Sequence, residues 1–169
     1  TTTPWTIPAN LGICLNKDYT YALVESEKGK LIVLEELVDA LWEKFGLETK
    51  KKLATYKGSE LEMITCQHPL YDRESLVILG DHVTADAGTG CVHTAPGFGA
   101  DDFFIGQKYG LPAYCNVDEH GCMMEDAGDW LKGQYVDDAN KTVTQRLDAM
   151  GALLKLEFIT HSYPHDWRT

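Results

Sequence analysis

The sequence predicts an α+β fold, in which about three peripheral helices surround an antiparallel sheet or barrel. Several short segments alternate apolar and polar residues, as half-buried strands do, and three longer segments repeat apolar residues at helical spacing. Many short strands with dispersed helices favour the α+β class. The 169 residues, 44% of them hydrophobic, suffice for one well-packed domain and are few for two.

The first half of the chain is predicted to hold two strand pairs and one helix. Alternating side chains and turn residues place the strands at 19–25, 30–33, 58–66 and 75–79. The first two strands form a hairpin around a turn at Lys28 and Gly29, and the last two form a second antiparallel pair. A helix is predicted over 35–45, where apolar residues recur at helical spacing and Gly46 follows as a C′ glycine.

The second half is predicted to hold two helices, a long loop and a final strand. Residues 101–109 and 139–150 carry apolar residues at helical spacing, and a glycine follows each segment. Between them, residues 116–138 are acidic, dotted with glycine and weakly periodic, so this loop is expected to be the most mobile part of the chain. Residues 153–159 are predicted to return as a strand.

The charge balance limits the classes of partner. With 15 Lys and Arg against 26 Asp and Glu, the formal net charge is −11, which argues against an extended nucleic-acid footprint. Any RNA contact is therefore expected to be small. The sequence has no apolar run of about 18 residues, and its polar start lacks the regions of a signal peptide. A soluble, cytoplasmic protein without membrane contact is expected.

The cysteines and histidines do not indicate a disulfide framework or a metal site. The five cysteines are scattered without a C-x-x-C pair, so reduced, mostly buried thiols are expected. His161 and His165 have a spacing that zinc ligands use, but Pro164 opposes the helix that would align them. The glycines near residue 90 match neither the dinucleotide nor the P-loop pattern. We therefore expect no metal and no cofactor.

The start of the chain places four hydroxyls beside an aromatic ring, in the run Thr1-Thr2-Thr3-Pro4-Trp5-Thr6. Hydroxyl groups can orient a water molecule or a carbonyl oxygen, and an indole ring can stack on a nucleoside. The alternative is that the threonines form a strand, with their hydroxyls bound to neighbouring backbone, and that the tryptophan is a core residue. The chain lacks an initiator methionine and opens on this motif, so we expect it to be part of a longer polypeptide.

The segment over 88–102 combines four glycines with His93, Asp101 and Asp102. Glycine lets the backbone approach a ligand closely, and an aspartate at a helix start caps free N–H groups near the positive end of the helix dipole. Because one carboxylate is enough for the cap, the other can face a cationic ligand such as an α-ammonium group. The alternatives are a hydrogen-bonded structural histidine and two acids that serve only the helix start.

Three motifs together resemble the editing domain inserted into isoleucyl-tRNA synthetase, known as connective peptide 1. They are TTTPWT at the start, GTGCVHTAPGFGADD in the middle and HSYPHDWR at the end, so the resemblance covers residues 1–169 as a single editing domain. The related valyl and leucyl enzymes typically carry an arginine in place of Thr3 and lack a histidine at His93, so these two residues point to the isoleucyl member. The aminoacylation motifs are absent, and this chain is not expected to charge tRNA.

The resemblance implies hydrolysis of valyl-tRNA(Ile), and of valyl-adenylate as well, with isoleucine excluded by size. The implied partners are the 3′ end of aminoacyl-tRNA(Ile), the valine moiety and the catalytic domain of the parent synthetase. Asp102 would anchor the α-ammonium group, and His93 would line the pocket where the extra carbon of isoleucine collides. The threonines and Asn10 would bind the terminal adenosine, the carbonyl oxygen or the attacking water. The implied catalytic residues are Thr2, Thr3, Asn10 and Asp102, and the implied substrate-binding residues are Thr1, Trp5, His93 and Asp102.

Two alternatives share these residues. A binding module would hold an aminoacyl 3′ end without turnover, since the sequence offers no unmistakable nucleophile. The equivalent editing domain of a valyl- or leucyl-tRNA synthetase is the other alternative. A purely structural insertion is disfavoured, because the threonine motif and the His–Asp segment occur together.

Overall fold

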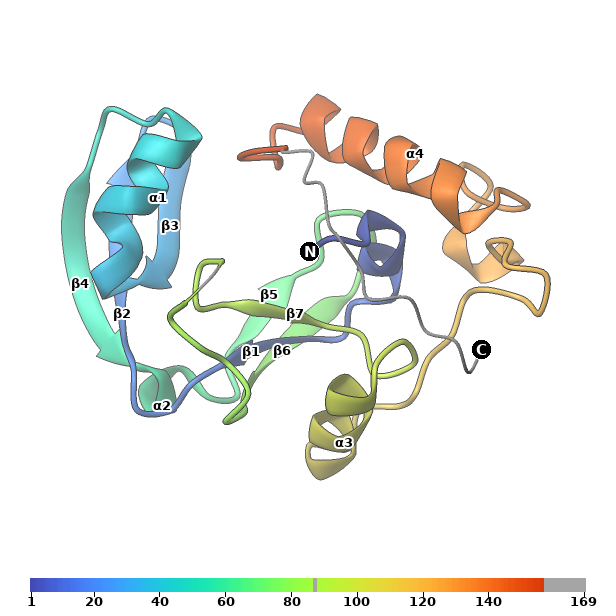
Figure 1. Ribbon diagram of the computed structural model, residues 1–169, viewed down its shortest axis with the longest axis horizontal. Coiled ribbons are helices and arrows are strands. Elements are labelled where there is room, and N and C mark those ends of the chain that lie inside the picture. The colour runs from blue at the N-terminus through green and yellow to red at the C-terminus, as the bar shows by residue number, and fades with distance from the viewer. Residues whose placement is uncertain (87, 157–169) are drawn as a thin grey trace, which may run out of the picture.

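The structure, a computed structural model, describes residues 1–86 and 88–156 and has an α+β fold with two sheets. One sheet has four strands in the order β5-β6-β1-β7, and the other has three in the order β3-β2-β4 (Figure 1). The strands are β1 (Gly12–Leu15), β2 (Thr20–Ser26), β3 (Gly29–Leu34), β4 (Lys51–Lys57), β5 (Thr65–Gln67), β6 (Glu74–Leu79) and β7 (Val92–Thr94). The α-helices are α1 (Val38–Phe45), α2 (Gly58–Leu61), α3 (Ala100–Lys108) and α4 (Val136–Ala149), and the 3-10 helices are η1 (Pro4–Ala9), η2 (Glu35–Leu37) and η3 (Glu125–Ala127).

The predicted α+β class is confirmed, but the strands within residues 1–86 and 88–156 do not close into a barrel. The smaller sheet ends at β3 and β4, and the larger sheet ends at β5 and β7. A barrel would need such edges to pair with one another. The larger sheet is also not fully antiparallel, because β1 runs parallel to β6 with Gly12 opposite Leu76. In Figure 1 the smaller sheet stands upright at the left of the larger one.

The predicted hairpin and first helix form the smaller sheet and its cover. β2 and β3 pair antiparallel around the predicted turn. α1 packs on one face of this sheet, where Trp42 meets Ala22 and Val24 in a buried cluster. The helix ends at Gly46, whose φ of 67° is left-handed, as expected of a C′ glycine. Hairpin and helix are both confirmed.

Residues 58–66, predicted as a strand, instead form α2 and the start of β5. A Cβ atom on Gly58 would lie 2.1 Å from the carbonyl oxygen of Asn16, so the backbone approaches that segment closely at a glycine. The side chain of Glu60 accepts a hydrogen bond from the N–H of Lys57 at 3.1 Å, which stabilises one helical turn. The second predicted strand pair is confirmed as the antiparallel β5 and β6.

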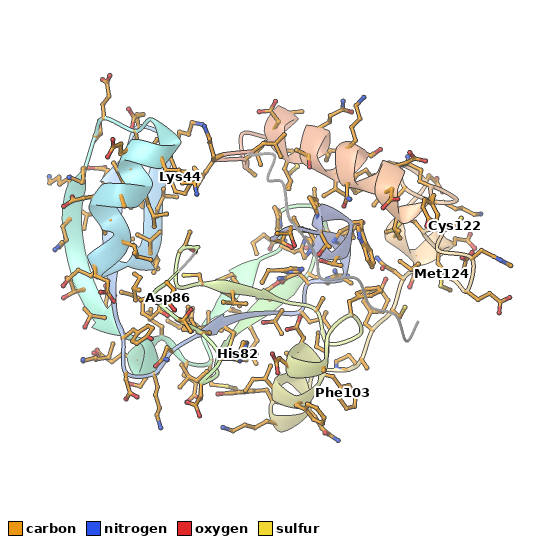
Figure 2. All side chains as sticks on the ribbon, viewed as in Figure 1. Lys44, His82, Asp86, Phe103, Cys122 and Met124 are labelled. Carbon is orange, nitrogen blue, oxygen red and sulfur yellow. The ribbon has the colours of Figure 1, made fainter. Side chains whose placement is uncertain are left out.

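The helix predicted over 101–109 is present as α3 and covers one face of the larger sheet. Ile105 and Tyr109 pack against a buried cluster around Cys14 of β1. Phe103 is exposed, and Figure 2 shows it on the outer side of the helix, pointing away from the sheet. α3 therefore attaches to the sheet through one side and leaves an aromatic side chain in solvent.

The loop predicted over 116–138 contains η3 and two isolated β-bridges. Its Met123 and Leu131 are buried beneath α4 together with Val143. The helix predicted over 139–150 is confirmed as α4, which begins earlier, at Val136, and packs against η1. The loop is therefore part of the packing that supports the first residues of the chain, and its expected mobility stays a prediction.

The remaining expectations concern the end of the chain, the cysteines and the membrane. Residues 153–156, predicted to begin a strand, belong to none. The rest of that predicted strand, and the motif with His161 and His165, lie outside the described residues. All five cysteines are free, as expected, but only Cys14 is buried. None of the described helices combines the length and the apolar composition that crossing a membrane requires.

Candidate functional site

The threonine-rich start of the chain leads into η1 and does not form a strand. Pro4 occupies the first turn of this 3-10 helix, where its missing N–H is tolerated. Thr1, Thr2 and Thr3 are exposed. The Thr1 hydroxyl lies 3.3 Å from the Thr3 hydroxyl and accepts a hydrogen bond from the N–H of Thr3 at 3.1 Å. The threonines therefore do not form a strand, but the Thr1 hydroxyl does bind neighbouring backbone, as that alternative also stated.

Thr6 connects this segment to His93 on β7. Its hydroxyl donates to the carbonyl oxygen of Thr3 at 2.9 Å and lies 2.9 Å from Nε2 of His93. Because the Thr6 hydroxyl hydrogen is bound to the Thr3 carbonyl oxygen, Nε2 of His93 must carry a hydrogen, and it donates a hydrogen bond to the Thr6 oxygen. The Thr3 hydroxyl lies 3.5 Å from the same Thr6 oxygen.

Asn10, directly after η1, binds the other nitrogen of His93. The Asn10 amide nitrogen donates to Nδ1 of His93 at 2.6 Å and to the carbonyl oxygen of Gly12 at 3.0 Å. Its amide oxygen accepts a hydrogen bond from the Ser75 hydroxyl at 2.5 Å. Both ring nitrogens of His93 are thus bound within the protein. Burial lowers the pKa of His93 to about 4, so the imidazole is neutral at neutral pH.

Asp102 stands in the first turn of α3 and is attached to the end of β7. Its Oδ2 accepts a hydrogen bond from the N–H of Ala95 at 3.0 Å, which leaves Oδ1 unused by the described part of the protein. A Cβ atom on Gly99 would lie 3.3 Å from the carboxyl carbon of Asp102, so a glycine there leaves room for the carboxylate.

The expectation that Asp101 or Asp102 caps α3 is wrong. The N-cap residue is Gly99, which has no side chain, and no side-chain cap is formed. Asp102 uses its carboxylate on Ala95 instead. Both acids still lie in the first turn, where the helix dipole stabilises negative charge.

Trp5 borders the network, and Thr2 stands apart from it. The Trp5 ring packs edge-on against Phe98, with ring centroids 5.0 Å apart, and is half-buried against the cluster beneath α4. Its backbone N–H donates to the side-chain oxygen of Asn140 at 2.9 Å. Trp5 therefore belongs partly to the core. Thr2 is exposed, and its side chain makes no hydrogen bond within residues 1–86 and 88–156.

The structure thus brings Thr1, Thr3, Asn10 and His93 into one hydrogen-bonded network. Thr6 links its two halves and was not among the predicted site residues. Thr6 follows Thr3 by three residues in the hydroxyl-rich run, so the sequence pattern could have indicated it as a site residue.

The β5–β6 hairpin contributes groups that the sequence did not reveal. Nε2 of the buried His68 donates to the carbonyl oxygen of Ile7 at 2.9 Å, and Nδ1 accepts from the N–H of Leu70 at 3.0 Å. The Arg73 guanidinium donates to the carbonyl oxygen of Pro8. The hairpin therefore binds two consecutive carbonyl groups of η1. Only the turn composition around His68 was visible in the sequence.

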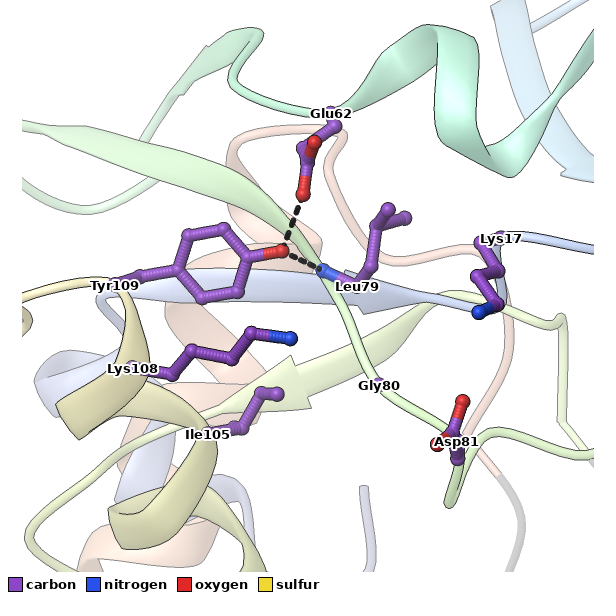
Figure 3. A pocket seen from close by; sticks show the side chains of 8 residues that line it. All are labelled: Lys17, Glu62, Leu79, Gly80, Asp81, Ile105, Lys108 and Tyr109. Atoms are coloured by element: carbon purple, nitrogen blue, oxygen red, sulfur yellow. Dashed lines mark hydrogen bonds between the residues drawn. The ribbon is translucent and has the colours of Figure 1, made fainter.

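A separate pocket lies between the end of β6 and the end of α3 (Figure 3). The hydroxyl of Tyr109 donates to Glu62 and accepts from the N–H of Leu79 at 3.1 Å. Lys17, Asp81 and Lys108 also line it, so its charges are mixed and indicate no single class of ligand. None of the predicted site residues lines this pocket. In the part of the chain that the structure describes, no three His, Cys, Asp or Glu side chains are grouped as a metal site requires.

Comparison with known proteins finds relatives along the whole chain. No protein-family model matches it. It is 58% identical over 169 residues to isoleucine–tRNA ligase 1 of Oceanobacillus iheyensis. The isoleucine–tRNA ligases of Bacillus subtilis and Geobacillus thermodenitrificans are 57% and 56% identical over the same length. Each match covers 100% of this chain and 18% of the relative, so the chain spans less than a fifth of the relatives' length.

Solved structures share the fold. The crystal structure of GlLeuRS-CP1 has a TM-score of 0.71 at 17% identity, covering 97% of this chain and 82% of that chain. The editing domain of the P. falciparum cytosolic leucyl-tRNA synthetase has a TM-score of 0.68 at 12% identity, covering 93% of this chain and 78% of that chain. At such identities the similarity concerns the fold alone.

Proposed function

Because the chain belongs to the isoleucyl-tRNA synthetase family and has the fold of a CP1 editing domain, we propose that it is an editing hydrolase for mischarged tRNA. Its substrate in this proposal is valyl-tRNA(Ile), and it also hydrolyses valyl-adenylate. One observation carries the proposal: hydroxyl and amide groups surround a neutral His93 that is bound at both nitrogens. Such groups can orient a water molecule beside a small amino-acid ester.

The need for such a site follows from the limits of binding energy. A missing methylene changes binding by only about 1–3 kcal/mol, and the discrimination of isoleucine from valine by this synthetase family is itself the established example of that limit. Valine is therefore attached to tRNA(Ile) at an appreciable rate. A second site that admits valine and excludes the larger isoleucine removes the error.

Asp102 fits the α-ammonium group of the substrate. The Ala95 N–H holds one carboxylate oxygen, and the other is available to a ligand. A carboxylate and an ammonium group form a charge-assisted hydrogen bond, which is about twice as strong as a neutral one. Asp102 therefore supplies the anchor that any aminoacyl ester shares, whatever its side chain.

His93 fits a size barrier better than a general base. A general base needs a free nitrogen within reach of the water, and Thr6 and Asn10 occupy both nitrogens. A pKa of about 4 also makes the imidazole a weak base. A ring held at both nitrogens keeps its position, so it can collide with the extra methylene of isoleucine and not with valine.

The proposed reaction is the hydrolysis of an activated ester. Water attacks the ester carbonyl carbon, the bond to the ribose oxygen breaks, and that oxygen takes up the proton that water releases. Thr2 and Thr3 orient the water or the carbonyl oxygen, with Asn10 in support, while Thr1 and Trp5 contact the terminal adenosine. Orienting the reacting groups supplies much of the rate enhancement in such reactions, so the proposal requires neither a metal nor a covalent intermediate.

Only the 3′ end of the tRNA reaches this site in the proposal. The formal net charge of −11 disfavours a large phosphate footprint on this chain. The chain spans 18% of the length of its relatives. The rest of the parent enzyme would therefore bind the tRNA body and supply the catalytic domain.

Parallel deacylation assays with valyl-tRNA(Ile) and isoleucyl-tRNA(Ile) test the proposal. We expect the 169-residue chain to release valine and to leave isoleucyl-tRNA intact. Binding of both 3′ ends without release of valine would instead support the alternative of a binding module.

The size barrier is tested by His93→Ala in the same assays. This variant is expected to release isoleucine as well, and to keep most of the valine release, because the ring no longer blocks the longer side chain. His82→Ala, at an exposed histidine in the β6–β7 loop (Figure 2), is the matched control. Loss of both activities at equal folded content would make His93 catalytic and not a barrier.

A further inference from the structure

Three polar side chains from the β5–β6 hairpin reach the segment that carries the candidate site. His68 and Arg73 bind carbonyl groups of η1, and Ser75 binds the side chain of Asn10. Ser75 and Asn10 are 65 residues apart in the sequence. Of the three, only Ser75 binds a side chain that itself binds His93.

Ser75 and the Gly12 carbonyl oxygen together determine which way the Asn10 amide points. Ser75 is 3% exposed, and its hydroxyl donates to the amide oxygen at 2.5 Å. The amide nitrogen then lies against two acceptors, the Gly12 carbonyl oxygen at 3.0 Å and Nδ1 of His93 at 2.6 Å. A flipped amide would place its oxygen against the Gly12 carbonyl oxygen with no hydrogen between them, which is unfavourable.

The amide orientation in turn fixes the tautomer of His93. Nδ1 accepts from Asn10, so the single proton of the neutral ring is on Nε2. Nε2 donates to the Thr6 hydroxyl, which donates to the Thr3 carbonyl oxygen. The hydrogen bonds therefore run in one direction from Ser75 to Thr3, and each donor has its acceptor.

We propose that Ser75 is a positioning residue, which holds the Asn10 amide and through it the tautomer and the ring position of His93. Without the Ser75 hydroxyl, the Asn10 oxygen loses this donor and the amide can rotate. When the amide rotates and the Thr6 hydroxyl turns to donate to Nε2, His93 also populates the Nδ1–H tautomer, and its ring no longer keeps one position. The tautomer claim depends on the hydrogen bonds alone, whereas its consequence for substrate discrimination rests on the proposed function.

Long-range proton–nitrogen NMR of the His93 imidazole tests the tautomer claim at about pH 7. The unchanged 169-residue chain and Ser75→Thr, which keeps the hydroxyl, are expected to show a single Nε2–H pattern. Ser75→Ala is expected to show a mixture of tautomers. Ser26→Ala is the matched control, because Ser26 is also buried, at 6% exposed, and its hydroxyl donates to the Gly29 carbonyl oxygen at the far hairpin.

Deacylation by the same variants tests the consequence. The ratio of valine release to isoleucine release is expected to fall about tenfold in Ser75→Ala, which is less than the roughly hundredfold effect that a misplacement of about 1 Å can have. Ser75→Thr, which keeps the hydroxyl, is expected to keep the ratio close to that of the unchanged chain. Should Ser75→Ala fail to fold, Ser75→Cys replaces it, because cysteine has a similar shape and only a weak donor.

A single Nε2–H pattern in Ser75→Ala, or an equal tautomer shift in Ser26→Ala, overturns the proposal. If the unchanged chain releases neither amino acid, the proposed function fails. The NMR comparison still decides the role of Ser75 in that event, so the two failures are distinguishable.

Discussion

Asp102 accepts a hydrogen bond from the Ala95 N–H with one carboxylate oxygen, and our proposal assigns the other oxygen to the α-ammonium group of the substrate. Asp102→Asn preserves the size of the side chain and an oxygen for the Ala95 N–H, but it removes the charge. A charge-assisted anchor is worth about 1.5–3 kcal/mol, so kcat/KM for valyl-tRNA(Ile) is expected to fall roughly 10-fold to 150-fold. Thermal unfolding is expected to change little.

Asp101→Asn is the matched control for that experiment. Asp101 is exposed and shares the first turn of α3, so it experiences the same helix dipole. Its variant is expected to keep full activity. Equal losses in the two variants would show that the general charge of the helix start matters and that Asp102 holds no ligand.

His93 also gives the fold a pH dependence. Burial lowers its pKa from 6.5 to about 4, so the unfolded chain takes up a proton on this ring before the folded protein does. The stability that the neutral ring contributes is complete above about pH 6.5 and is lost as the pH falls towards 4. His68, whose pKa burial also lowers, acts in the same direction.

The measurement is the decrease in melting temperature from about pH 7.5 to about pH 5. Ordinary carboxylates have pKa values below this range, so they contribute little to the decrease. The loss is expected to be larger for the unchanged chain than for His93→Gln, which cannot titrate at this position. Identical losses in both proteins would mean that His93 is not buried in a neutral form.

The motifs and the family resemblance pointed to several residues of the candidate site, but not to the residues that hold them in place. Thr3, Asn10 and His93 were predicted and lie in one network. Ser75 and His68 were not predicted, because a serine in a strand and a histidine in a turn have no local feature that separates them from others of their kind. Their importance arises from contacts across more than 60 residues of sequence, which only the fold brings together.

At the level of elements, η1 is bound from the β5–β6 hairpin, from β7 and from α4. The position of η1 therefore does not depend on the hydroxyls of Thr2 and Thr3. Thr2→Val with Thr3→Val is expected to stay folded, because both residues are exposed and substitutions at exposed positions usually change stability little. If the hydroxyls orient water or the ester carbonyl, this double variant loses valine release.

Unfolding curves and deacylation rates of the double variant decide whether the two hydroxyls act in turnover. Thr55→Val, at an exposed threonine of β4, serves as the control. Full hydrolytic activity in the Thr2→Val, Thr3→Val protein would show that the hydroxyls have no part in turnover.

The sequence predicted the longer elements and missed the short or charged ones. α1, α3 and α4 were found because apolar residues recur through them at helical spacing. β4 was missed because lysines at both of its ends hide the alternation of its exposed and half-buried residues. β1 and β7 are too short for alternation to be recognised, and most of β1 is buried. Such strands are defined by their partners in the sheet.

At the level of the whole molecule, the charge is unevenly distributed. Residues 1–57 hold eight lysines and eight acidic residues, so the net charge of −11 belongs to the rest of the chain, which includes β7, α3 and α4. The chain is therefore expected to bind uncharged tRNA weakly at physiological salt, while it hydrolyses small adenosine esters of valine.

Fluorescence titration of uncharged tRNA at several salt concentrations, with hydrolysis of valyl-adenosine in parallel, tests this expectation. The titration is expected to show little binding near physiological salt. Submicromolar affinity for the uncharged tRNA under those conditions would contradict it and would require a phosphate-binding surface that the charge distribution does not indicate.

The packing of η1 against α4 also sets an order of events during synthesis. Asn140 of α4 binds the backbone of Trp5, and Val143 shares a buried cluster with Ile7. The first residues of the chain therefore cannot reach their final positions until Asn140 and Val143 of α4 have left the ribosome. At about 5–20 residues per second, that interval is on the order of ten seconds. Both sheets have been fully translated well before then, so among the described residues the candidate site assembles after the sheets on a growing chain.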